Sequence, residues 1–143
     1  YATMAYSDHA LERFLNYQNA KTSFSNKEKE AINLIVSQVN SCLYCLSAHT
    51  IIGKMNGFTE AQILSIRKGE SEHSKLDALV KLAKEITENK GKASDNRIQS
   101  FFNEGYTKEN LVDLIIQVSE KTAMNYLHNL TNVPIDFPLA ATI

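Results

Sequence analysis

The stretch between residues 28 and 49 reads EKEAINLIVSQVNSCLYCLSAH, an apolar helical pattern that runs into a Cys-x-x-Cys motif. The apolar residues from Ala31 to Val39 recur at the spacing of an amphipathic helix. Ser25, followed by Glu28 three residues later, forms a capping box that predicts where this helix begins. We expect the helix to end near Asn40, so that Cys42 opens the next one.

Helical periodicity extends outward from this stretch in both directions. The apolar residues of the N-terminal segment predict a first helix from near Ser7; they are Ala10, Leu11, Phe14 and Leu15. Further helices are expected to begin near Thr59, Ser74, Ser94 and Thr107. Helix ends are expected at Gly57, Gly69, Lys90–Gly91 and Gly105. The tail after Leu130 contains Pro134 and Pro138 and is expected to be extended.

No alternating strand pattern bracketed by hairpin turns interrupts these helices. The sequence therefore predicts an all-α fold of six to seven helices, with the Cys-x-x-Cys motif at the start of the third. A length of 143 residues fits one domain, which we expect to span residues 1–143.

Composition and charge exclude several classes of function. The net charge is -1 and no basic stripe is present, so the sequence gives no reason to expect nucleic acid as a partner. No apolar run approaches the roughly 18–20 residues that cross a bilayer, and no secretory signal is recognisable. We therefore expect no membrane association and a cytoplasmic location, where thiols stay reduced.

The chemistry of the chain is expected at Cys42, Cys45 and His49. On a helix, residues spaced at i, i+3 and i+7 share one face, so the three reactive groups point the same way. A helix start also supplies free N–H groups and the positive end of the helix dipole, which lower the pKa of a thiol. His49 adds a base or an imidazolium partner for Cys45. This pattern indicates thiol redox chemistry without choosing a substrate.

Two other interpretations of the cysteines stay open at this stage. Two thiols and an imidazole are three ligands of a tetrahedral zinc site, whose fourth ligand would come from His9, His73, His128 or a carboxylate. None of these lies at the spacing of a zinc finger, and a chain of this size folds around its own core. The other interpretation is a pair of buried, unreactive cysteines beside a core histidine.

The segment from Glu28 to His49 resembles the AhpD-like alkylhydroperoxidase branch of the carboxymuconolactone decarboxylase superfamily, and above all its uncharacterised peroxidase-related members. The similarity continues through Gly57-Phe58-Thr59-Glu60 and Ile63, and returns in the tail from Asn125 to Pro138. The resemblance implies an all-α fold that forms homo-oligomers, often trimers or hexamers. It also implies peroxide as substrate, no bound cofactor, and a thiol reductant that is a lipoyl or thioredoxin-like carrier.

The same resemblance implies a role for each candidate residue. The peroxidatic cysteine of the family falls on Cys45, and the resolving cysteine falls on Cys42. The proton-relay histidine and glutamate fall on His49 and Glu30. One departure is Tyr44, which stands between the cysteines where characterised relatives can carry a histidine; a phenol is a poor base near neutral pH.

The sequence thus predicts a thiol-dependent alkyl hydroperoxidase or disulfide reductase. One rival is a lactone decarboxylase-like enzyme, against which the complete cysteine motif argues, because that activity does not use the pair. Another rival is a redox-sensing or zinc-binding oligomeric module. His128, near the end of the last helix, is a candidate for the lining of the pocket, but it is interpreted in the first place as a partly exposed structural histidine. Tyr126 and Phe137 are interpreted as core or interface residues.

Overall fold

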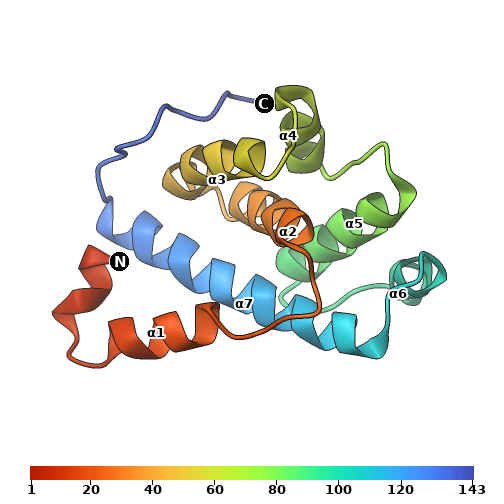
Figure 1. Cartoon of the computed structure of the whole chain (residues 1–143), viewed down its shortest axis with the longest axis horizontal. Coiled ribbons are helices and arrows are strands. Elements are labelled where there is room, and N and C mark those ends of the chain that lie inside the picture. Colours follow the sequence, from red (N-terminus) through yellow and green to blue (C-terminus); the bar gives the residue numbers. More distant parts are fainter.

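The computed structural model describes residues 1–143 and contains helices but no strands, as the sequence predicts (Figure 1). One short 3-10 helix precedes seven α-helices. Their bounds are Ala2–Tyr6 for η1, Ala10–Gln18 for α1, Asn26–Val39 for α2, Leu43–Met55 for α3, Glu60–Lys68 for α4, Ser74–Glu88 for α5, Asp95–Asn103 for α6 and Lys108–Thr131 for α7.

Local capping explains where most of these helices begin. Ser25 and Glu28 form the expected capping box at the start of α2, and Thr59 and Gln62 form a second one at the start of α4. A third box at Thr107 was not predicted, because Asn110 takes the place of the usual Glu or Gln. Gly69 ends α4 with a φ of 95°, the left-handed conformation that glycine adopts without strain.

Two expectations about helix boundaries are corrected. The first α-helix begins at Ala10 rather than near Ser7, because residues 2–6 form the separate η1 and Ser7 has an extended backbone. Ser94 precedes α6 as predicted, but its side chain does not cap the helix. Its backbone N–H instead donates a hydrogen bond to Glu85 at the end of α5.

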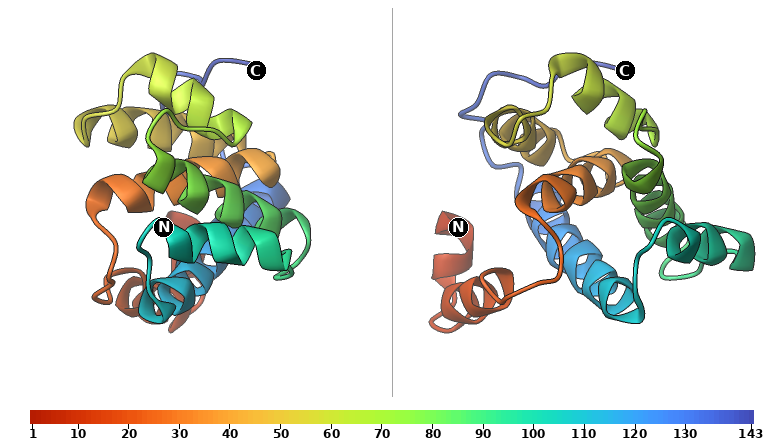
Figure 2. Two further views of the ribbon diagram at one scale, coloured as in Figure 1. Left: turned by 90° about the vertical axis from the view of Figure 1, so that its right-hand side faces the viewer. Right: turned by 45° about the vertical axis from the view of Figure 1, so that its right-hand side comes forward.

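Helix α2 lies at the centre of the fold and packs against α3, α4, α5 and α7 (Figure 1, Figure 2). The buried apolar side chains of α2 join those of α4, α5, α6 and α7 in one cluster of 18 residues. The members Ile32, Leu34 and Ile35 are fully buried, so truncating any of them to alanine is expected to cost roughly 2–5 kcal/mol. This core fixes α2 and α7 as the rigid elements on which the site is built.

Helix α7 has two unlike faces. Its inward face carries a buried polar stripe of Gln117, Glu120, Lys121, Asn125 and His128. Its outward face carries exposed apolar side chains, namely Val112, Ile115, Ile116, Ala123, Tyr126 and Leu130. Tyr126 is therefore not a core residue of the single chain.

The two ends of the chain lie beside the central helices. Helices η1 and α1 form an arm to one side of the bundle (Figure 2), tied to α7 by the Gln18–Glu120 and Tyr17–Ile116 hydrogen bonds. The tail after α7 runs past α3 without regular structure (Figure 1), where the N–H of Ala140 donates to Ser47 at 3.0 Å. No helix combines the length and apolar character needed to cross a membrane.

Candidate active site

The two cysteines occupy the turn that joins α2 to α3. Ser41 has a positive φ of 53°, which turns the chain sharply, and Cys42 is the N-cap residue of α3. The backbone N–H of Cys45 donates to the Cys42 sulfur at 3.4 Å, and the two Sγ atoms lie 2.8 Å apart. The motif thus begins the third α-helix, as predicted, with its sulfurs in direct contact.

The two thiols lose their protons at different pH values. The pKa of Cys42 is lowered to about 7, chiefly by the hydrogen bond from the Cys45 thiol. The Cys45 N–H, Asn125 and the Lys121 charge lower it further, whereas burial opposes the shift. The pKa of Cys45 is raised, because its proton is held by Cys42 and because the site is buried. The helix-start effect expected from the sequence therefore appears at Cys42 and not at Cys45.

Glu30 and His49 form a buried hydrogen-bonded pair beside the cysteines. The Nδ1 of His49 lies 2.6 Å from Oε2 of Glu30, and both residues are less than 10% exposed. Burial and the Lys121 charge lower the pKa of His49 in spite of the neighbouring carboxylate. Burial also opposes the ionisation of Glu30, but the hydrogen bond and charge of His49 outweigh it and lower the pKa of Glu30. A neutral imidazole that donates from Nδ1 to a carboxylate keeps its Nε2 free as a base.

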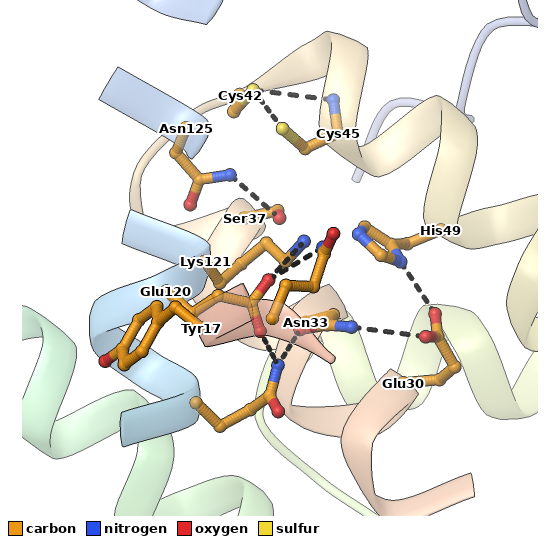
Figure 3. Close-up of polar contacts among 12 residues, drawn as sticks. Tyr17, Glu30, Asn33, Ser37, Cys42, Cys45, His49, Glu120, Lys121 and Asn125 are labelled. Atoms are coloured by element: carbon orange, nitrogen blue, oxygen red, sulfur yellow. Dashed lines mark hydrogen bonds and ion pairs between the residues drawn. The ribbon is translucent and has the colours of Figure 1, made fainter. Parts of the chain in front are cut away.

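A polar network extends from Glu30 to α7 (Figure 3). Asn33 donates to Glu30 at 3.2 Å and accepts from Gln117 at 2.9 Å, and Gln117 also donates to Glu120 at 2.8 Å. Lys121 is 4% exposed. Its ammonium lies 3.8 Å from a carboxylate oxygen of Glu120 and makes no hydrogen bond within the protein. A buried cation of this kind stabilises negative charge nearby.

A cavity of about 410 Å³ brings these groups together. Its walls include Glu30, Cys45, His49, Lys121 and His128, whereas Cys42 does not reach it. Cys42 is fully buried and Cys45 is 3% exposed, so the cavity is the route by which a small molecule reaches the sulfur pair. The four residues predicted as catalytic therefore lie together, with Cys45 and not Cys42 facing the open space.

The structure corrects the interpretation of His128. It is buried rather than partly exposed, its Nδ1 lies 3.2 Å from the Cys45 sulfur, and its ring lies against Tyr44. His49 makes no hydrogen bond to either sulfur, so the imidazole in contact with Cys45 is that of His128. The sequence did carry a signal for it, because the polar residues of α7 recur at helical spacing from Gln117 to His128, as a buried polar face would.

Cys42, Cys45 and His128 are also the one group of three metal-ligating side chains with all ligand atoms within 4.8 Å of one another. His9 and His73 are exposed and take no part. Two Zn–S bonds at the tetrahedral angle hold their sulfurs about 3.8 Å apart. The sulfurs of Cys42 and Cys45, at 2.8 Å, are closer than that, so their placement fits a reacting thiol pair better than a zinc site.

The all-helical fold, with the Cys-x-x-Cys motif at the start of a helix, agrees with the fold that the family resemblance implies. The model of the carboxymuconolactone decarboxylase family matches residues 7–89, and the chain belongs to this family. The protein YdfG of Bacillus subtilis strain 168, described as uncharacterized, is 25% identical over 108 residues, which are 73% of this chain and 74% of YdfG.

Two solved structures share the fold. An uncharacterized peroxidase-related protein from Silicibacter sp. TM1040 superposes with a TM-score of 0.78 at 15% identity, over 96% of this chain and 74% of its own. A cysteine-to-alanine variant of the debrominase Bmp8, in complex with 2,3,4-tribromopyrrole, superposes with a TM-score of 0.78 at 14% identity, over 93% of this chain and 74% of its own. At these identities the likeness establishes the fold.

Proposed function

We propose that the protein is a thiol-dependent peroxidase of the AhpD-like type, which also acts as a disulfide reductase when the substrate is a disulfide. The observation that carries the proposal is the contact of the two sulfurs, 2.8 Å apart, with one of them facing a cavity that the Glu30–His49 pair also lines. Membership of the carboxymuconolactone decarboxylase family and the fold of the peroxidase-related protein support it.

In the proposed reaction, Cys45 attacks as the thiolate. Its sulfur forms a bond to the terminal oxygen of the peroxide, the O–O bond breaks, and the alkoxide leaves with the electron pair. Cys45 is thereby oxidised to a sulfenic acid and the peroxide is reduced to an alcohol. Cys42 then attacks the Cys45 sulfur and expels hydroxide, which forms the disulfide and completes the reduction of ROOH to ROH and water.

The two departing oxygens, the alkoxide and the hydroxide, take up two protons in each cycle. His49 is proposed to carry them, because its Nε2 is free while Nδ1 is held by the Glu30 carboxylate. The negative charge of Glu30 stabilises the imidazolium that forms for a short time. Proton transfer by a positioned side chain contributes roughly 10²- to 10⁴-fold to a rate.

The burial of the sulfurs supports a particular kind of reductant. Cys42 is fully buried and Cys45 is almost fully buried. A folded thioredoxin-like protein therefore finds no exposed sulfur on this chain to dock against. A small dithiol, or one on a slender tether such as a lipoyl arm, enters a cavity of about 410 Å³ more easily. We therefore favour the lipoyl carrier over the thioredoxin-like carrier as the physiological reductant.

The outward face of α7 supports self-association as part of this proposal. Its apolar residues follow one helix face over several turns, and Val112, Tyr126 and Leu130 are each more than 60% exposed. Contiguous exposed apolar surface of this kind marks interaction sites. A second copy of the chain is the proposed occupant, in the trimers or hexamers that the family resemblance implies.

The experiment that tests the function is peroxide consumption under excess dithiol by the wild type, Cys45→Ser and Cys42→Ser. We expect turnover by the wild type, none by Cys45→Ser, and a sulfenic acid that accumulates on Cys45 in Cys42→Ser. A wild type whose thiols titrate normally but which turns over no peroxide with any dithiol would contradict the peroxidase proposal.

Repeated turnover, zinc content and activity on other substrates separate the rivals. A redox sensor is oxidised once and stops, whereas a catalyst continues while reductant lasts. A zinc-binding module retains stoichiometric zinc after purification. A lactone decarboxylase-like activity would survive both cysteine substitutions. Addition of 2,3,4-tribromopyrrole in place of peroxide tests whether the reaction instead resembles that of the debrominase.

A further inference from the structure

The contact between His128 and Cys45 has no role in the reaction described so far. The Nδ1 of His128 lies 3.2 Å from the Cys45 sulfur, within hydrogen-bond distance for a sulfur partner. His128 comes from the last turns of α7 and Cys45 from the first turn of α3, so the contact joins elements 83 residues apart. Both residues line the cavity.

In the sulfur pair alone, the negative charge lies on Cys42, the sulfur that does not face the cavity. Near neutral pH the two sulfurs share one proton, and the hydrogen bonds from Cys45 to the Cys42 sulfur place the negative charge on Cys42. Cys42 is fully buried and does not line the cavity, whereas Cys45 does. Attack on a molecule in the cavity therefore requires the shared proton to cross from Cys45 to Cys42.

We infer that His128 is a further catalytic residue, which donates a hydrogen bond from Nδ1 to the Cys45 sulfur and so makes Cys45 the nucleophile of the pair. The inference rests on the proposed function, since it concerns the same reaction. When the shared proton moves across the 2.8 Å between the sulfurs, Cys42 becomes the thiol and Cys45 the thiolate. The N–H of His128 then stabilises the new charge, and no other group is oxidised or reduced in this step.

The surroundings of His128 suit a neutral donor. Burial lowers its pKa, and the positive charge of Lys121 acts in the same direction. The other titratable groups that face it are Cys45, with Cys42 behind it, and Tyr44, whose ring stacks on the imidazole. A neutral imidazole carries one hydrogen, and a thiolate at Nδ1 selects the tautomer with that hydrogen on Nδ1.

The contact with the Tyr44 ring fixes the direction in which His128 points. The two rings lie 4.2 Å apart between centroids, and Phe137 from the C-terminal tail packs edge-on against Tyr44 at 5.5 Å. Tyr44 is thus a positioning residue, in contact with both the tail and His128. This arrangement provides the cysteine pair with an imidazole from α7, although the residue between the cysteines is a tyrosine.

The test measures which cysteine reacts, independently of peroxide turnover. Reduced protein at pH 7 is treated with a limiting amount of iodoacetamide, and the labelled cysteine and its rate are read by peptide mass spectrometry. The variants are His128→Leu, which removes the donor, and His128→Asn, whose amide N–H can stand near the Nδ1 position. His73→Leu, at an exposed site remote from the cavity, is the matched control.

We expect wild type and His73→Leu to be labelled mainly at Cys45. In His128→Leu the Cys45 rate is expected to fall about 10- to 100-fold, the size of a hydrogen bond to a charged group, and to recover at least in part in His128→Asn. An unchanged Cys45 rate in a folded His128→Leu variant overturns the inference, even if peroxide turnover is found. Conversely, Cys45 labelling that depends on His128 in a protein that reduces no peroxide overturns the proposed function and not the hydrogen bond.

Discussion

The ring of Tyr44 lies over the imidazole of His128, with centroids 4.2 Å apart and planes inclined at 36°. This pair joins the centre of the Cys-x-x-Cys motif to the end of α7, two segments that the sequence separates by more than eighty residues. Because burial and Asp136 raise the pKa of Tyr44, its hydroxyl stays protonated near neutral pH and offers no base. The ring, rather than the hydroxyl, is the useful part of the side chain.

Substitutions at Tyr44 distinguish these two parts. Tyr44→Phe keeps the stacked ring, and its Cys45 labelling rate is expected to stay within about twofold of wild type. Tyr44→Ala removes an aromatic contact worth about 0.5–1.5 kcal/mol, so the rate is expected to fall about 3- to 10-fold. Tyr6→Ala, at a tyrosine that is almost fully exposed, is the control. Equal losses in Tyr44→Phe and Tyr44→Ala would show that the hydroxyl matters instead.

The charge of Glu30 is expected to matter more for turnover than for folding. Glu30→Gln keeps a hydrogen-bond acceptor for His49 but removes the negative charge that stabilises an imidazolium. Peroxide turnover is expected to fall roughly 100-fold or more, with circular dichroism unchanged. Glu60→Gln removes an exposed partner of Lys54 and is expected to alter neither property. A Glu30→Gln variant with wild-type turnover would remove Glu30 from the relay.

The helices could be predicted from the sequence because their signals are local. The capping boxes at Ser25 and Thr59 and the stop at Gly69 depend on residues within one turn of each other. The start of α1 was placed too early, because the spacing of apolar residues does not show that the backbone at Ser7 is extended. Cys42, Cys45 and His49 were recognisable for the same reason, since eight consecutive residues contain them all.

The α7 part of the site depends on tertiary packing, so Lys121 was missed and His128 was interpreted mainly as a structural residue. His128 and Lys121 are far from the cysteines in sequence, and each alone resembles an ordinary helix residue. Not every apolar residue of α7 faces the core, since Ile115 and Ala123 lie on its outward face. The inward side of α7 is apolar in its first half, at Leu114 and Val118, and polar beyond, where it meets the cavity.

The buried Lys121 is expected to help hold the pKa of Cys42 at about 7. Lys121→Met fills the same space without the charge, so the pH midpoint of thiol alkylation is expected to rise by at least about half a unit. The measurement is the iodoacetamide rate between pH 6 and 9. Lys108→Met, at an exposed lysine in the first turn of α7, should leave the midpoint in place. A midpoint that does not move in Lys121→Met would assign the low pKa of Cys42 to its hydrogen bonds from Cys45 and Asn125, without a contribution from the Lys121 charge.

Self-association through α7 is expected to disappear when charge is placed on its outward face. Ile115 and Tyr126 are both exposed in the single chain, so the double variant Ile115→Lys/Tyr126→Lys should fold normally. We expect wild type to elute from gel filtration as an oligomer and the variant to elute as a monomer. Ala61→Lys/Gln99→Lys, at exposed sites on α4 and α6, should elute with the wild type. A wild type that is monomeric at micromolar concentration would contradict the proposed self-association.

Acid is expected to destabilise the fold through the same buried groups. The pKa of His49 and that of His128 lie below 6.5 in the folded chain, so below pH 6.5 the unfolded chain binds protons that the folded chain does not. The free energy of unfolding therefore falls as the pH drops from 6.5 toward the folded pKa values. The pKa of Glu30 lies below 4.5 in the folded chain, so its contribution is present above pH 4.5 and is lost as the pH falls further.

Urea denaturation at pH 7.0, 6.0 and 5.0 measures this dependence. Wild type is expected to lose stability steadily over the range, and His49→Gln is expected to show a shallower loss, since one of the two buried histidines is gone. His73→Gln, whose side chain is exposed, should follow the wild-type curve. Equal stability of the wild type at pH 7.0 and 5.0 would mean that the two imidazoles are protonated as readily in the fold as in water, and a neutral His49 could then no longer serve as the base of the relay.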